Sequence, residues 1–172
     1  PESARSARAD DFSALRVKYG LSDRPFALYP AVTWEHKNHL RLLEALARLR
    51  DRAALEVRVV CTGHQTDFWP RIERRMNELG LGEQVKFLGL VPREELSTLY
   101  RAAQFVFIPT LFEAASAPLF EAWQHGAPAA CSSVRSALAS APSSNSDKPT
   151  TGGAFSPGPA GPWKWASGAG PL

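Results

Sequence analysis

The chain has 172 residues, 44% of them hydrophobic and 22% charged, which fits one globular domain or one half of a two-domain protein. Its 20 basic and 17 acidic residues are mixed along the sequence and leave a net charge of only +3, which argues against a nucleic-acid-binding protein. No stretch reaches the roughly 18 consecutive apolar residues that suggest a membrane-spanning helix.

The first 25 residues are polar and rich in Ala and Arg, with one short helical candidate from Asp11 to Tyr19. We expect this segment to be a linker. From Phe26 onward, short apolar runs alternate with segments of helical periodicity. Strands are expected at residues 26–29, 57–61, 85–88, 105–108 and 129–131, and helices at 38–50, 69–79, from 92 onward, and at 118–125. The strand at 105–108 is the most apolar, so we expect it to be central and buried on both faces.

Five strands that alternate with helices predict an α/β fold, a Rossmann-like doubly wound parallel sheet with right-handed crossovers. We expect this domain to span residues 26–134. Ligands of such sheets bind at the carboxyl ends of the strands, in the loops that lead into helices. Candidate functional residues are therefore sought in those loops.

The character of the sequence changes after Val134. Of the 37 residues from Ser136 to Leu172, 26 are Ala, Ser, Gly or Pro, and no apolar periodicity remains. We expect residues 135–172 to form a disordered tail, because they offer too little apolar surface to offset the entropy of ordering. The abrupt start of this segment suggests an out-of-frame or artificially joined end.

Isolated cysteines and histidines give little indication of a metal site. Cys61 and Cys131 match no metal-binding spacing, and each ends an apolar run. We expect two buried free thiols and a reducing, cytoplasmic compartment. His36 and His39 lie three residues apart without a third ligand, so solvated or capping positions explain them better than a metal does.

The loop after the first strand carries Lys37, immediately before a helix. Its ammonium group and the free N–H groups of the helix start could both face an anion. The alternative is a surface lysine beside a capping Asn38, and position alone does not decide between the two.

The loop after the fourth strand opens a helix at Pro118 and is rich in small residues. A phosphate could reach the helix start there. The amides expected to be available to it are those of Ala115, Ser116, Ala117 and Leu119. Glu113 and Glu121 bracket this region and could accept hydrogen bonds from the hydroxyls of a sugar and a ribose. The alternative is that both glutamates only favour the helix start electrostatically.

A third loop follows the third strand and contains Leu90 and Val91. Its small and apolar groups could line a flat nucleobase, with backbone groups reading the edge of that base. Without further context it is simply a strand-to-helix turn.

Together these segments resemble the C-terminal, donor-binding domain of group 1 glycosyltransferases of the GT-B fold. The strongest match is Leu111-Phe112-Glu113 followed by Pro118-Leu119-Phe120-Glu121-Ala122. Seven residues separate its two glutamates, a spacing typical of retaining members. Further matching segments, in the same order as in the family, are Leu28–Ala31, Trp34–His39, Val85–Gly89 and Leu99–Ala103.

The resemblance implies a role for each matching position. Lys37 would contact the donor diphosphate, Glu113 would hold hydroxyls of the transferred sugar, and these two residues would be catalytic. Glu121 would hold the ribose, the amides near Ser116 would bind phosphate, and the Leu90–Val91 turn would meet the base. No metal cofactor is expected, because fixed cationic and backbone groups would stabilise the departing diphosphate.

The implied partners are a nucleotide-sugar donor and a glycan, lipid-linked or small acceptor, the latter bound through an N-terminal domain that this chain lacks. Peripheral membrane association of a parent enzyme is left open. Many relatives carry an arginine shortly before the lysine, where this chain has Ala31, and the family pattern is lost after Val134. We therefore expect the isolated chain to be inactive.

Three other interpretations of the sequence are open. A non-catalytic nucleotide-sugar-binding module, or a truncated or degenerate transferase, would share the same motifs. A flavodoxin-like regulatory domain would need an acidic cluster at the strand ends, and the sequence has none there. A sugar-nucleotide epimerase shares the GT-B fold, but its catalytic carboxylates are not recognisable here.

Overall fold

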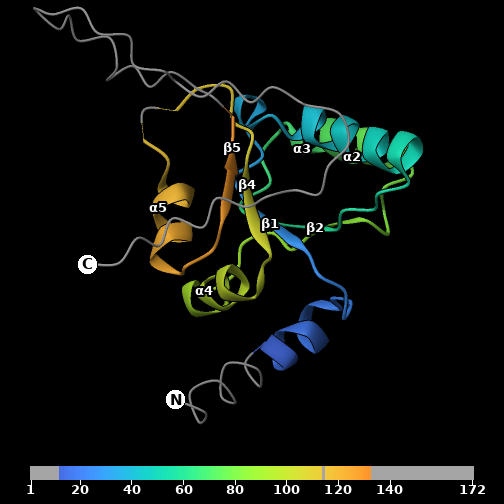
Figure 1. The fold of residues 1–172 in the computed structure, drawn as a ribbon. Helices are drawn as coiled ribbons and strands as arrows, with labels where there is room; N and C mark the ends of the chain where they lie inside the picture. Colours follow the sequence, from blue (N-terminus) through green and yellow to red (C-terminus); the bar gives the residue numbers. More distant parts are fainter. Residues whose placement is uncertain (1–11, 114, 133–172) are drawn as a thin grey trace, which may run out of the picture. The chain divides into compact units, whose positions relative to one another are not determined.

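The computed structural model describes residues 12–113 and 115–132, all within the first of two compact units, residues 1–141. These residues contain a five-stranded parallel sheet with the strand order β3-β2-β1-β4-β5 (Figure 1). The strands are β1 (Ala27–Pro30), β2 (Val59–Thr62), β3 (Val85–Phe87), β4 (Phe105–Ile108) and β5 (Ala129–Cys131). The tail expected at 135–172 lies outside the described residues.

Helices alternate with the strands along the chain, which confirms the predicted α/β doubly wound fold. They are η1 (Glu35–Lys37), α2 (His39–Ala53), α3 (Trp69–Glu78), α4 (Arg93–Ala102) and α5 (Ala117–Gln124). Side chains of α2 and α3 pack with one face of the sheet, and those of α4 and α5 pack with the other. In α2 the buried Leu42, Leu43 and Leu46 recur at helical spacing, so one side of the helix is apolar.

A further helix at residues 12–19 packs against the same apolar cluster as α4 and α5. Its Leu15 is buried, and Lys18 and Tyr19 both bond to the carboxylate of Glu95 in α4. The packed unit therefore extends N-terminally of Phe26, where we expected the domain to begin.

The central strand is β1, not β4 as we expected. All four residues of β1 are buried, whereas Phe105 and Phe107 of β4 are only half-buried. The strand order explains this difference, because β1 has two strands on each side and β4 has only β5 beyond it. Cys61 of β2 is buried as expected, but Cys131 is exposed because it lies on the outer strand β5.

The loops at the carboxyl ends of β1, β2 and β3 pack backbone against backbone. Gly63 donates its amide hydrogen to the carbonyl of Gly89 over 2.8 Å. It has φ of 129°, and a Cβ atom placed on it would lie 2.5 Å from the carbonyl oxygen of Ala31. Only glycine permits this approach, which holds the three loops together at one edge of the sheet.

Across residues 12–113 and 115–132, no helix combines the length and the apolarity needed to cross a membrane.

Candidate functional site

The structure brings Lys37 and Glu113 together at the carboxyl edge of the sheet. Lys37 ends the short helix η1 after β1, and Glu113 lies in the loop after β4. Since β1 and β4 are neighbouring parallel strands, these residues meet although 76 positions separate them in the sequence. The Lys37 ammonium donates a hydrogen bond to Oε1 of Glu113, and the two side chains are 18% and 16% exposed.

A small pocket surrounds this ion pair. It has one cation and one carboxylate against a largely apolar wall, and its lining residues are Tyr29, Pro30, Ala31, Lys37, Phe107, Ile108, Thr110, Glu113 and Pro118. Tyr29 also donates its hydroxyl hydrogen to the backbone carbonyl of Lys37, so the central strand fixes the turn that carries the lysine. The pocket therefore presents a charged pair on a rigid support.

Two buried polar atoms of the loop between β4 and α5 have no hydrogen-bond partner among the described residues. They are Oε2 of Glu113 and Oγ of Ser116. Buried polar atoms in folded proteins are nearly always satisfied, so both atoms are free to form a hydrogen bond with a ligand. The carboxylate oxygen can accept a hydrogen bond from a hydroxyl, and the serine hydroxyl can donate one to an anion.

The N-terminus of α5 lies at this loop. Ser116 precedes the helix, and its side chain makes no capping bond. The carbonyl of Ser116 accepts the amide hydrogens of Leu119 and Phe120 at 3.1 and 3.3 Å. We expected the Leu119 amide to be available to a ligand, and this was wrong, because the first turn of the helix already uses it.

Three amides at the start of α5 remain as candidates for a ligand. Those of Ala115, Ser116 and Ala117 make no backbone hydrogen bond to another described residue. Ala115 and Ala117 are exposed, and Ser116 is half-buried. The partial positive charge of the helix N-terminus would complement an anion placed against them.

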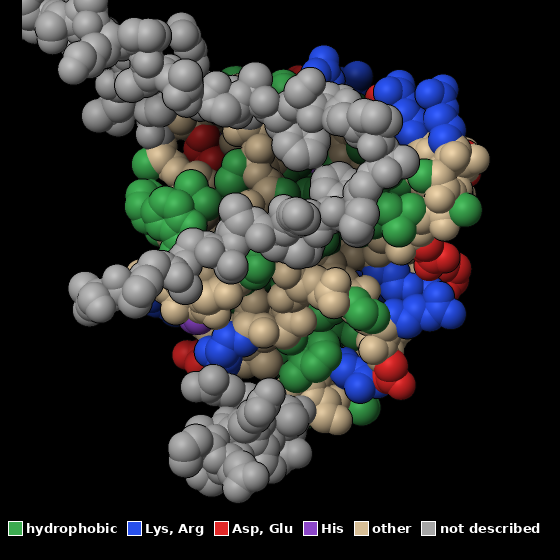
Figure 2. Space-filling model, in the orientation of Figure 1, with side chains coloured by type: hydrophobic (Ala, Val, Ile, Leu, Met, Phe, Trp, Pro, Cys, Tyr) green, Lys and Arg blue, Asp and Glu red, His purple; other side chains and the backbone are tan. Residues whose placement is uncertain are grey.

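Glu121 faces inward from the second turn of α5. Its Oε2 atom accepts a hydrogen bond of 2.7 Å from the hydroxyl of Tyr100, a buried residue of α4. Burial, together with the bond to Glu121, raises the pKa of Tyr100, so this hydroxyl stays protonated and acts as the donor. On the opposite side of α5, Phe120 and Trp123 are exposed, and Figure 2 shows hydrophobic side chains gathered over this helix.

Sequence reasoning assigned no role to Tyr100. The signal was present as a tyrosine among the apolar positions of α4, since a buried tyrosine usually needs a partner for its hydroxyl.

The surroundings of His39 and the hydrogen bond of Asn38 differ from those that we expected. His39 is neither solvated nor capping but 1% exposed, with its ring 4.6 Å from that of Tyr29 and 5.9 Å from that of Phe87. Its burial and, to a lesser extent, the nearby Lys37 lower the pKa of His39 to about 4. Asn38 does not cap α2, and its side-chain amide instead donates to the Pro109 carbonyl over 2.9 Å.

Of the predicted site residues, Lys37 and Glu113 line the pocket around Lys37, and the others do not. Leu90 is 75% exposed, and Val91 packs partly against the apolar cluster under α4. Neither lines the pocket. The structure therefore brings Lys37 and Glu113 together, and neither Ser116 nor the Leu90–Val91 turn lines the same pocket.

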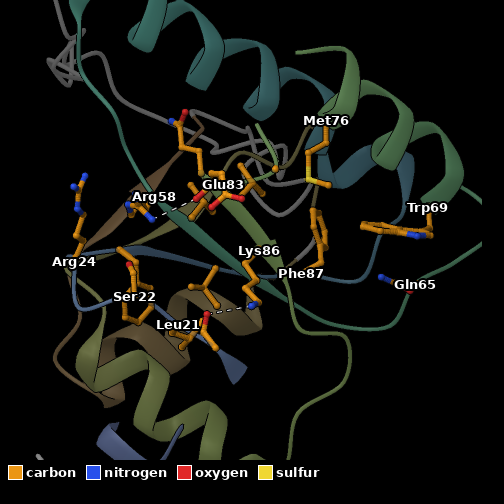
Figure 3. A pocket seen from close by; sticks show the side chains of 17 residues that line it. Leu21, Ser22, Arg24, Arg58, Gln65, Trp69, Met76, Glu83, Lys86 and Phe87 are labelled. Carbon is orange, nitrogen blue, oxygen red and sulfur yellow. Dashed lines mark hydrogen bonds between the residues drawn. The ribbon is translucent and has the colours of Figure 1, made fainter. Parts of the chain in front are cut away.

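A larger cavity of about 670 Å³ surrounds the edge strand β3 and shares no lining residue with the pocket around Lys37. Figure 3 shows Trp69 at one end of it and Arg24 at the other, with Phe87 and Lys86 between them. The Lys86 ammonium already donates to the Gly20 carbonyl at 3.1 Å. Two of its lining residues, Arg58 and Gln84, also carry a buried polar atom without a hydrogen-bond partner among the described residues, at Nε and Oε1.

No group of three or more His, Cys, Asp or Glu side chains that could hold a metal ion occurs in the described part of the chain.

Comparison with protein families and curated proteins gives a consistent result. The family model described as glycosyl transferases group 1 matches residues 11–143. The chain is 31% identical over 123 residues to O-antigen chain mannosyltransferase B of Escherichia coli, which covers 69% of this chain and 31% of that protein. It is 30% identical over 93 residues to an uncharacterized glycosyltransferase of Methanocaldococcus jannaschii, covering 54% of this chain and 23% of that protein.

Solved structures show the same fold. WaaG, a glycosyltransferase involved in lipopolysaccharide biosynthesis, matches at a TM-score of 0.56 and 26% identity over 69% of this chain and 31% of its own. HepE of Anabaena, solved in complex with UDP, matches in fold at a TM-score of 0.62 and 24% identity over 76% of this chain and 35% of its own. The chain thus spans between 23% and 35% of the length of these relatives.

Proposed function

Because this chain belongs to the group 1 glycosyltransferases, we propose that it is the donor-binding part of a retaining enzyme that transfers a sugar from a nucleotide-sugar to an acceptor. Its α/β fold and its glutamate motif had already indicated this family, and the family match confirms that resemblance. The observation that carries the proposal is the meeting of Lys37 and Glu113 beside the start of α5.

The orphaned atoms support a division of roles within the pocket. Glu113 accepts a hydrogen bond from Lys37 at Oε1. Its Oε2 is left to accept one from a hydroxyl of the transferred sugar. Lys37 keeps two of its three ammonium hydrogens, because Glu113 is its one hydrogen-bond partner among the described side chains. These hydrogens suit the diphosphate.

The same reasoning supports Glu121 as the ribose contact. Tyr100 occupies its Oε2 atom, so Oε1 remains for the ribose hydroxyls. Since α5 carries both Ser116 at its start and Glu121 one turn later, phosphate and ribose would lie along one helix. The base would then lie near the Leu90–Val91 turn.

The chemistry proposed is electrostatic. As the bond between sugar and diphosphate breaks, negative charge grows on the departing phosphate. Lys37 and the amides of Ala115, Ser116 and Ala117 would stabilise that charge, because they are fixed before the reaction begins. We propose that no metal cofactor takes part and that the acceptor attacks the face from which the diphosphate leaves, which retains the anomeric configuration.

The acceptor is proposed to be a glycan, a lipid-linked sugar or a small molecule. The names of the mannosyltransferase and of WaaG, which concern O-antigen and lipopolysaccharide, support the first two classes. The UDP complex of HepE supports a nucleotide-sugar as the donor class. We propose a cytoplasmic location and binding of the acceptor by a second domain, with peripheral association of the whole enzyme with a membrane.

Thermal unfolding of the 172-residue chain with a panel of nucleoside diphosphates and nucleotide-sugars tests donor binding. A ligand that binds only the folded state raises the unfolding midpoint. We expect UDP, GDP or ADP, together with the matching sugar donor, to raise it, and Lys37→Met to abolish the rise.

Lys18→Met is the matched control, because Lys18 also pairs with a glutamate, but in the helix at residues 12–19. It should leave the rise intact. A chain that responds to no donor, or equally with and without Lys37, would contradict the proposed function.

The isolated chain is proposed to bind a donor without transferring the sugar. Purified chain, donor and a defined acceptor should give no product. Product formation by the isolated chain would refute this. If a full-length parent protein also bound the donor without transferring the sugar, a non-catalytic binding module would be favoured instead.

A further inference from the structure

The loop that carries Lys37 and the loop that carries Glu113 are bonded to each other at three points besides the ion pair. The Leu111 amide donates to the His36 carbonyl over 2.8 Å, and the Thr110 hydroxyl donates to the same carbonyl over 3.2 Å. The Asn38 side-chain amide donates to the Pro109 carbonyl over 2.9 Å. The rings of His36 and Phe112 also stack across the two loops, with 4.8 Å between their centroids.

Asn38 is also the point at which the first loop changes direction. It has the left-handed conformation, with φ of 69° and ψ of 32°. Its amide ends η1 by donating to Glu35 over 3.0 Å, and its carbonyl begins α2 by accepting from Leu42 over 3.2 Å. Asparagine tolerates this conformation better than most residues, and unlike glycine it adds a side-chain donor.

We propose that Asn38 is a positioning residue of the donor site, which ties the turn after Lys37 to the end of β4 and so keeps Lys37 against Glu113. A lysine ammonium on its flexible four-carbon stem has no fixed place of its own. The backbone under it is held by Tyr29 on one side and by Asn38 on the other. The identity of the ligand rests on the proposed function, whereas the hydrogen bonds that hold Lys37 in place do not depend on it.

Two explanations of Asn38 make different predictions. If only the left-handed backbone matters, glycine should serve as well as asparagine, because it reaches that conformation without strain. If the bond to Pro109 matters, Asn38→Gly should behave like Asn38→Asp, in which a carboxylate faces the Pro109 carbonyl and cannot donate to it.

The chain offers a matched control at the other end of the same helix. Ala54 follows α2 with φ of 50° and is exposed. Ala54→Gly therefore makes the same kind of change to the backbone, away from the two loops.

Amide hydrogen exchange in the ligand-free chain tests the geometry. We expect exchange of the Leu111 amide to rise about fivefold or more in Asn38→Gly and Asn38→Asp, as loss of one hydrogen bond predicts. It should stay unchanged in Ala54→Gly. The Ala27 amide, bonded to the Arg58 carbonyl over 2.8 Å, serves as reference. Unchanged Leu111 exchange in Asn38→Gly, or an equal rise at Ala27, would overturn the proposal.

Calorimetric titration with UDP, GDP and ADP tests the consequence for binding. For any of these that the unaltered chain binds, both Asn38 variants should weaken affinity about fivefold to tenfold, and Ala54→Gly should not. Unaltered affinity in Asn38→Gly would overturn the role of Asn38. Failure of the unaltered chain to bind any diphosphate would count against the proposed function alone, while exchange at Leu111 would still decide the role of Asn38 in joining the loops.

Discussion

The hydroxyl of Tyr100 in α4 donates a 2.7 Å hydrogen bond to Oε2 of Glu121 in α5. Tyr100 is 1% exposed and Glu121 is half-buried, so the bond lies where water competes little. It fixes the carboxylate on the inner side of α5 and leaves the second carboxylate oxygen to accept a hydrogen bond from another group. A residue of one helix thereby sets the orientation of a candidate ligand-binding group on the next.

Tyr100→Phe should remove this bond and keep the buried ring. We expect the free energy of unfolding to fall by about 1 kcal/mol, the usual net value of one hydrogen bond. Affinity for the diphosphate that the chain binds should fall severalfold, because Glu121 is then less well oriented. Urea unfolding and calorimetry measure the two effects.

Tyr19→Phe is the control for this change, since Tyr19 also donates to a glutamate, Glu95 of α4, to which no role in donor binding is assigned. It should leave diphosphate affinity unaltered. An equal loss of affinity in both variants would show that Tyr100 acts only through general stability.

Glu113→Gln and Glu121→Gln should separate the sugar from the ribose. Glu121→Gln removes a charge from the proposed ribose contact, so affinity for both the diphosphate and the intact sugar donor should fall by about 1.5–3 kcal/mol. Glu113→Gln should spare the diphosphate and weaken only the intact donor. Calorimetry with both ligands checks the asymmetry, and equal losses for both ligands in both variants would reject the assigned roles.

His39 should make stability depend on pH. The folded state takes up a proton on His39 only near pH 4, whereas the unfolded chain does so near the ordinary pKa of 6.5. Between these values the unfolded state binds more protons, so stability falls as the pH falls. The contribution of neutral His39 to the free energy of unfolding is fully present above about pH 6.5 and amounts to about 3 kcal/mol at most.

His39→Phe keeps a flat ring between Tyr29 and Phe87 but cannot titrate. The difference in unfolding free energy between the two proteins, measured in urea from pH 7 to pH 4, isolates this group from other titrations. We expect a smaller slope with pH in the variant. The same slope in both proteins would contradict the burial of a neutral His39.

Gly63→Ala should destabilise the chain strongly. The added Cβ atom would lie 2.5 Å from the Ala31 carbonyl oxygen, and φ of 129° is unfavourable for alanine. We expect a loss of about 3 kcal/mol, at the upper end for a strained backbone position. Gly82→Ala is the control, because a Cβ atom there meets nothing within 4 Å. Urea unfolding compares the two variants. Similar losses of stability would contradict the close packing of the loop after β2 against the loop after β1.

The order of strands and helices could be predicted from the sequence because it depends on local periodicity. Apolar runs such as Phe105–Ile108 and the leucine spacing of α2 are readable within a few turns of chain. The two glutamates around Pro118 were also found locally, since their spacing is a property of one segment.

Which residues meet was decided only by the tertiary structure. The strand order made β1 central and left Phe105 and Phe107 half-buried, although their own segment is the most apolar. The pairing of Lys37 with Glu113 spans 76 positions and that of Tyr100 with Glu121 spans 21. Such contacts depend on how strands pair and helices pack across the sheet, and no local pattern carries that information.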